Sequence, residues 1–102
     1  MFLASCKTED GTHTVRYLIT GPQTIARFVL YTNETGNLDQ ISNVPIPWEK
    51  TITVQGLHGV SCHASFDYGN SQTYTAKVFV DGFEVATASS STGSVSASGV
   101  TQ

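Results

Sequence analysis

Hydrophobic and polar residues alternate along most of this chain with a period of two residues. This period is typical of β-strands that bury one face and expose the other, and almost nothing in the sequence has the period of a helix. Short runs of Gly, Pro, Asn and Asp separate the alternating segments. We therefore predict strands at residues 13–20, 24–33, 38–42, 51–55, 60–66, 73–80 and 83–88, and a last short strand around Val95, Ala97 and Val100.

The residues between these segments predict the kind of turn more clearly at some positions than at others. Asp81-Gly82 is the clearest, because a two-residue type I′ hairpin turn needs positive φ angles that suit Asp and Gly. Gly21-Pro22-Gln23 is too short for anything but a direct reversal, so we expect the strands on either side of it to form an antiparallel pair. Pro45 and Pro47 lack the amide donor that a central strand needs, and they indicate an edge or a crossover between sheets.

Seven or eight short strands at this spacing predict an all-β fold, an immunoglobulin-like antiparallel β-sandwich of about seven strands. We expect a single β-sandwich domain over residues 13–100, with a core built from the inward-facing strand positions. These positions are Val29, Tyr31, Trp48, Ile52, Val54, Cys62, Ala64, Phe66, Val78 and Val80.

Composition narrows the class of protein. Charged residues make up 13% of the chain, about half the usual share, and the abundance of Ser and Thr is typical of extracellular β-proteins. The net charge is −3 and no basic cluster is present, so the sequence excludes a nucleic-acid partner. No apolar run approaches the roughly 18 residues of a membrane-spanning helix.

Residues that could carry catalysis are few and dispersed. Cys62 and His63 point to opposite faces of one predicted strand, so they do not combine with His58 into a metal site. No nucleophile elbow, zinc-binding helix or phosphate-binding glycine loop is present. We therefore expect no enzymatic activity, no cofactor and no metal.

The state of Cys62 has two interpretations. Alternation places Cys62 on an apolar face with Ala64 and Phe66, where a free thiol packs as a small hydrophobic group. A disulfide to Cys6 would instead close a long loop, which the chain-entropy model credits with about 4 kcal/mol. We favour the buried free thiol.

The first residues carry a motif of their own. Leu3-Ala4-Ser5-Cys6 resembles a bacterial lipobox, in which a branched apolar residue and two small residues precede the cysteine that receives a diacylglycerol. The resemblance implies lipidation of Cys6, attachment to a membrane and an extracytoplasmic location in the cell envelope. Residues 1–12 would then form a lipobox-like start and a flexible linker. A lipidated Cys6 could not also form a disulfide with Cys62.

A second resemblance runs over residues 15–98 and rests on the order of several motifs. The motifs are Tyr17-Leu18-Ile19-Thr20-Gly21, then residues 26–31, then Ile46-Pro47-Trp48 with residues 51–54 behind it, then Val78-Phe79-Val80-Asp81-Gly82. This order is similar to the ectodomain pattern of the small mycobacterial membrane proteins, the MmpS family. That family typically has a cysteine before its late hairpin and another near its end, whereas this chain has Ala76 and a serine-rich tail.

The resemblance to MmpS implies a function in the cell envelope. It predicts an adaptor to a lipid or siderophore exporter, with a membrane transporter as protein partner and the lipid on Cys6 in place of the family's membrane helix. The alternative is a phage-encoded or prophage-encoded surface lipoprotein that blocks superinfection, or an immunoglobulin-like decoration domain of a virion. A small enzyme inhibitor that presents a loop is a third hypothesis.

Exposed aromatic residues are the candidates for contact with a partner, because they bury a large area at a low entropy cost. The candidates are Trp48, Tyr68, Tyr74, Phe79 and Phe83. Trp48 has a second interpretation, as a plug in the core between the two sheets.

Overall fold

The computed structural model describes residues 11–22, 24–56, 59–66 and 73–101. Within these residues lie eight strands, and none of these residues is helical. The strands are β1 Thr12–Thr20, β2 Ile25–Thr32, β3 Leu38–Pro45, β4 Trp48–Gln55, β5 Gly59–Ser65, β6 Tyr74–Val80, β7 Phe83–Ser90 and β8 Ser94–Val100. The predicted all-β class is confirmed.

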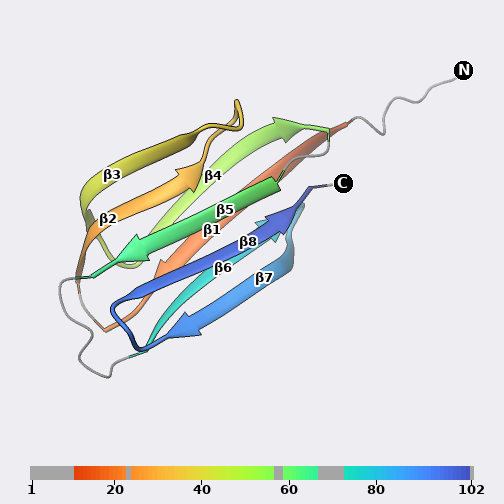
Figure 1. The fold of residues 1–102 in the computed structure, drawn as a ribbon. Coiled ribbons are helices and arrows are strands. Elements are labelled where there is room, and N and C mark those ends of the chain that lie inside the picture. The colour runs from red at the N-terminus through yellow and green to blue at the C-terminus, as the bar shows by residue number, and fades with distance from the viewer. Residues whose placement is uncertain (1–10, 23, 57–58, 67–72, 102) are drawn as a thin grey trace, which may run out of the picture.

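The strands form two antiparallel sheets that pack face to face as a sandwich (Figure 1). One sheet has the order β4-β1-β6-β7, and the other has the order β3-β2-β5-β8. The predicted β-sandwich is therefore confirmed, with four strands in each layer. On one side of the sandwich the edge strands β7 and β8 approach each other, and on the other side the edges are β3 and β4.

The expected pairing of the first two strands is wrong. β1 lies between β4 and β6, where Val15 is opposite Ile52 on one side and Val80 on the other. β2 belongs to the other sheet, between β3 and β5. Alternation shows which face of a strand is buried, but this pattern is the same in a hairpin and in a corner that joins two facing sheets. The short connection after Thr20 is such a corner.

Two predictions about turns are confirmed. Asp81 and Gly82 join β6 to β7 with φ angles of 53° and 86°, as a two-residue turn of positive φ requires. Pro45 ends β3, which is an edge strand, and the chain changes sheet before β4 begins at Trp48.

The inner faces of the two sheets meet in one apolar core. Nine of the ten residues expected in this core are buried, and Trp48 is half-buried against it. β1 supplies three further core residues that were not predicted, since Val15, Tyr17 and Ile19 have no exposed surface. The Tyr17 hydroxyl donates a hydrogen bond of 2.8 Å to the carbonyl oxygen of Thr32, so the polar end of this side chain is satisfied between the layers.

Candidate functional site

Aromatic side chains lie between the two sheets on the side where β3 and β4 are the edges. The ring centroids of Trp48 and Tyr31 are 5.5 Å apart, and the rings are tilted by 44°. Ile41 of β3 is half-buried against the same core. We call the surface formed by Tyr31, Asp39, Ile41, Trp48 and Lys50 the open edge.

Two charged residues of opposite sign lie at the open edge. The Nζ atom of Lys50 is 6.0 Å from the centroid of the Tyr31 ring, at the outer limit of a cation–π contact. The Asp39 carboxylate is close enough to the Tyr31 hydroxyl to influence its titration. Burial of the ring, followed by the charge and hydrogen bond of Asp39, raises the pKa of Tyr31. Tyr31 is therefore neutral at physiological pH and is held in place by the core and by Asp39.

Tyr74 is buried, and the expectation that it is exposed is wrong. Its side chain has no exposed surface, and its ring stacks on Phe66 with centroids 3.9 Å apart. A Cβ atom at Gly21 would lie 2.1 Å from Cδ1 of Tyr74, so the ring needs a glycine at that position. Tyr74 begins β6 in phase with the buried residues Ala76 and Val78, and this alternation could have identified it as a core residue.

Phe79 lies on the outer face of its sheet, where it is half-buried. The guanidinium carbon of Arg16 is 4.2 Å from the centroid of the Phe79 ring. Arg16 also forms an ion pair with Glu49 of β4. These contacts link β6, β1 and β4, which are neighbours in one sheet. Arg16 covers the Phe79 ring, so Phe79 is less available to a partner than the sequence indicates.

Phe83 is the most exposed large hydrophobic residue that the structure describes, with 75% of its surface accessible. Val85 of β7 and Val100 of β8 are also exposed, at 45% and 49%. The other two candidates, Tyr68 and Cys6, lie outside the described residues.

Both ends of the described chain meet at one end of the sandwich, which we call the Gly11 end (Figure 1). The backbone amide of Gly56 donates a hydrogen bond of 3.0 Å to the carbonyl oxygen of Gly11. The hydroxyl of Thr101 donates a hydrogen bond of 2.7 Å to the carbonyl oxygen of Gly56. The start of β1, the turn after β4 and the residue after β8 are thereby linked.

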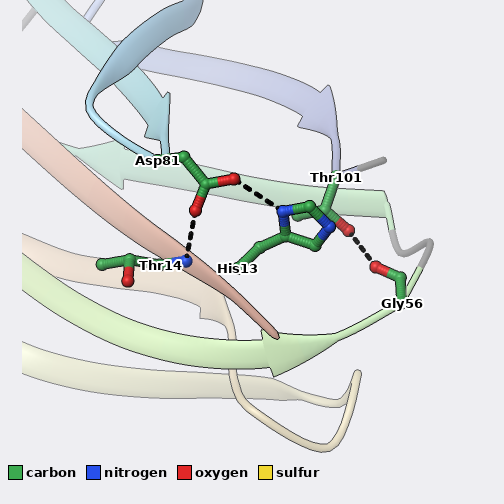
Figure 2. A network of polar contacts seen from close by, with 5 residues as sticks. All are labelled: His13, Thr14, Gly56, Asp81 and Thr101. Carbon is green, nitrogen blue, oxygen red and sulfur yellow. Dashed lines mark hydrogen bonds and ion pairs between the residues drawn. The ribbon is translucent and has the colours of Figure 1, made fainter. Parts of the chain in front are cut away.

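Asp81 adds the β6–β7 turn to this network (Figure 2). Its backbone amide donates to the carbonyl oxygen of Thr14 at 2.8 Å, and its Oδ1 accepts a hydrogen bond of 3.0 Å from the Thr14 amide. Its Oδ2 lies 2.7 Å from Nδ1 of His13. The hydrogen bond from His13, followed by that from the Thr14 amide, lowers the pKa of the Asp81 carboxyl.

The His13–Asp81 pair fits a structural role. Nε2 of His13 is buried and has no hydrogen-bond partner among the described residues. A general base needs a nitrogen within reach of a substrate proton, and this nitrogen faces the protein interior. The pair therefore joins the start of β1 to the β6–β7 turn.

Cys62 is buried and free, as predicted. Burial raises the pKa of its thiol to about 12, so the thiolate that reacts with electrophiles is rare at neutral pH. The described residues contain no group of three or more His, Cys, Asp or Glu side chains suited to a metal ion. They also form no helix with the length and apolar character needed to cross a membrane.

No protein-family model and no curated protein matches the chain. The resemblances to a lipobox and to the MmpS ectodomain therefore stay hypotheses that rest on the motifs quoted above.

Proposed function

We propose that this chain is a non-enzymatic accessory domain of a bacterial cell envelope, held at the outer face of a membrane by a lipid on Cys6. In this proposal it binds a membrane transporter and acts as an adaptor to a lipid or siderophore exporter. The Leu3-Ala4-Ser5-Cys6 motif supports the anchor, and the order of motifs shared with MmpS ectodomains supports the partner.

The observation that best supports a binding role is the packing of Trp48 on Tyr31 at the open edge. Binding surfaces commonly centre on an aromatic residue whose position is fixed before the partner arrives. Tyr31 is held by burial and by Asp39, and it supports the half-buried Trp48 ring. Lys50 and Asp39 place charges of both signs around the aromatic pair, as polar rims of interfaces do.

The edge strands favour contact through side chains over the addition of a partner strand. β3 ends in Pro45, which has no amide proton, and Asn43 of β3 has a φ angle of 54°, which departs from extended geometry. β4, the edge strand of the other sheet, carries the exposed charged residues Glu49 and Lys50. Proline, irregular geometry and charge are the features that block edge-to-edge pairing.

The membrane anchor can be tested by fractionation of the native host. Wild-type protein should sediment with membranes, and Cys6→Ser should be released, because two or three acyl chains are needed for stable anchoring and the variant has none. Equal distribution of the two proteins, whether in the membrane or in the soluble fraction, would show that Cys6 carries no anchor.

The partner can be tested separately with a photoreactive amino acid. We expect p-benzoylphenylalanine in place of Trp48 to cross-link to a component of an exporter in intact cells. The matched control has the same amino acid in place of Thr53, an exposed residue of β4 that is out of phase with the buried Ile52 and Val54. Equal cross-linking from both positions would contradict a partner surface at the open edge, and cross-links to virion proteins would favour the phage alternative.

A further inference from the structure

Exposed apolar side chains are concentrated on two adjoining edge strands of the sandwich. Of the five large hydrophobic residues that are exposed in the described chain, three lie on β7 and β8, the strands that approach each other at one side. We call Phe83, Val85 and Val100 the seam patch. Cγ2 of Val85 is 2.8 Å from the position that a Cβ atom at Gly99 would take, so the two strands are in direct contact here.

The seam patch lies near the Gly11 end. Phe83 begins β7 opposite Val80, two residues after the turn residue Asp81, whose amide bonds to Thr14. Val100 ends β8, and the next residue, Thr101, bonds to Gly56. The start of β7 and the end of β8 therefore lie at the same end of the sandwich as the start of β1 (Figure 1), with Phe83 level with Val15 across β6.

A lipid on Cys6 would bring this end of the sandwich to the membrane. Five peptide units separate Cys6 from Gly11, and at about 3.5 Å per residue they reach no further than roughly 18 Å. A tether of this length keeps the Gly11 end near the lipid surface.

We propose that the seam patch is a membrane-contact surface, and that Phe83 inserts into the boundary between headgroups and acyl chains when the protein is tethered. This inference rests on the proposed lipid anchor. The partner surface is then an uncharged lipid bilayer, since the net charge of the protein is −3 and no basic cluster is present to attract anionic lipid. Contact by apolar insertion is insensitive to salt, unlike contact between charges.

Two features of the fold favour insertion of this surface. The hydrogen bonds of Asp81 to Thr14 and His13 hold the hairpin that carries Phe83, so little order is lost when the side chain enters lipid. Trp48 begins β4, at the opposite end from Gln55, which pairs with Thr12. A β4 strand of this length places Trp48 on the order of 23 Å along the strand from the membrane end, on the side accessible to a partner.

The test uses the full chain with one saturated acyl chain coupled to Cys6 through a maleimide. Coupling is selective because Cys62 is buried, and mass spectrometry verifies a single label. Binding to phosphatidylcholine vesicles is measured by cosedimentation, since one acyl chain alone holds a protein only marginally. The acyl chain is attached chemically and not by the cell. The vesicle result therefore tests the seam patch independently of whether Cys6 is acylated in the host, which the fractionation of Cys6→Ser tests.

We expect Phe83→Ser to lower the vesicle partition coefficient about tenfold, as the loss of a partly inserted phenyl ring should. Ile25→Ser is the matched control: Ile25 is 54% exposed and begins β2, outside the seam patch. The partition coefficient of Ile25→Ser should stay within about twofold of wild type. Raising the salt concentration about fivefold should change neither the wild-type coefficient nor that of Ile25→Ser.

A second measurement covers the case in which Phe83→Ser unfolds, which circular dichroism would show. Phe83→Trp should show a blue-shifted emission on vesicles and quenching by brominated lipid, whereas the native Trp48 should show neither. The proposal is overturned if Phe83→Ser binds like wild type, if Ile25→Ser loses binding equally, or if the tryptophan at position 83 stays in water. It is also overturned if wild type dimerises without lipid and Phe83→Ser does not, because the seam patch would then bind a second copy.

Discussion

The side chain of Val85 lies directly over Gly99, although the two residues belong to different sheets. Cγ2 of Val85 takes the space beside Gly99 into which a larger residue would project. The close approach of β7 and β8 therefore depends on the absence of a side chain at position 99. The two sides of the sandwich therefore differ in what lies between their edge strands. Val85 meets Gly99 on one side, and the rings of Tyr31 and Trp48 lie on the other.

We expect Gly99→Ala to lower the free energy of unfolding by about 1 to 2 kcal/mol, because the added methyl group displaces Val85. Val85→Ala in the same chain should restore much of this loss, since it removes the atom that clashes. Urea unfolding of the two single variants and the double variant measures the coupling. Additive effects would show that the two side chains do not compete for space.

Gly21→Ala should be more damaging, with a loss of about 3 kcal/mol or more. A Cβ atom at this position would lie 2.1 Å from the Tyr74 ring, which is stacked on Phe66 and cannot move outward. Gly59→Ala is the control, since nothing lies within 4 Å of a Cβ atom there. Thermal unfolding followed by circular dichroism compares them. A similar small effect in both variants would contradict the packing of Tyr74 against Gly21.

The Asp81 carboxylate should stabilise the fold in a pH-dependent way. Its pKa is lowered in the folded protein, so its contribution is present above the unfolded value of about 3.9 and is lost as the pH falls through the folded value. Asp81→Asn keeps a residue that tolerates positive φ and removes the charge.

Melting temperatures across the pH range measure this effect. Wild type should melt above Asp81→Asn from pH 5 to pH 7, and the difference should shrink at about pH 4 and below. Glu34→Gln, which removes another surface carboxylate, should show a smaller difference. A gap between wild type and Asp81→Asn that persists unchanged in acid would mean that the charge of Asp81 is not its source.

The two thiols should react at very different rates. With its pKa raised to about 12 and its side chain buried, Cys62 should resist a maleimide at pH 7 until the protein unfolds. For protein produced without a lipid on Cys6, we expect one fast-reacting thiol under native conditions and two in denaturant. Finding no free thiol under either condition would mean that Cys6 and Cys62 form a disulfide.

Alternation predicted the strands well because burial of one face repeats every two residues. Ile52 and Val54, or Ala64 and Phe66, are buried as this period requires. The same period does not say which sheet a strand joins, so it cannot distinguish the corner after Thr20 from a hairpin.

The surface was harder to predict from sequence than the core. Tyr74 follows a polar loop, and the loop obscured its place in the alternation of β6. Phe79 is out of phase with the core, as expected, but its cover by Arg16 depends on strands brought together by the fold. Phe83 is also out of step with Val78 and Val80 in the sequence, and it is exposed as expected.

The central position of β1 determines when the protein can fold. Thr12 pairs with Gln55 and Thr20 with Thr75. The first strand can therefore pair only after residues in the second half of the chain have been synthesised. At about 5 to 20 residues per second, synthesis takes on the order of 3 to 11 seconds to pass from Thr20 to Thr75. Pairing between distant segments also makes folding slow. During synthesis the sandwich therefore closes only after the C-terminal strands have been made.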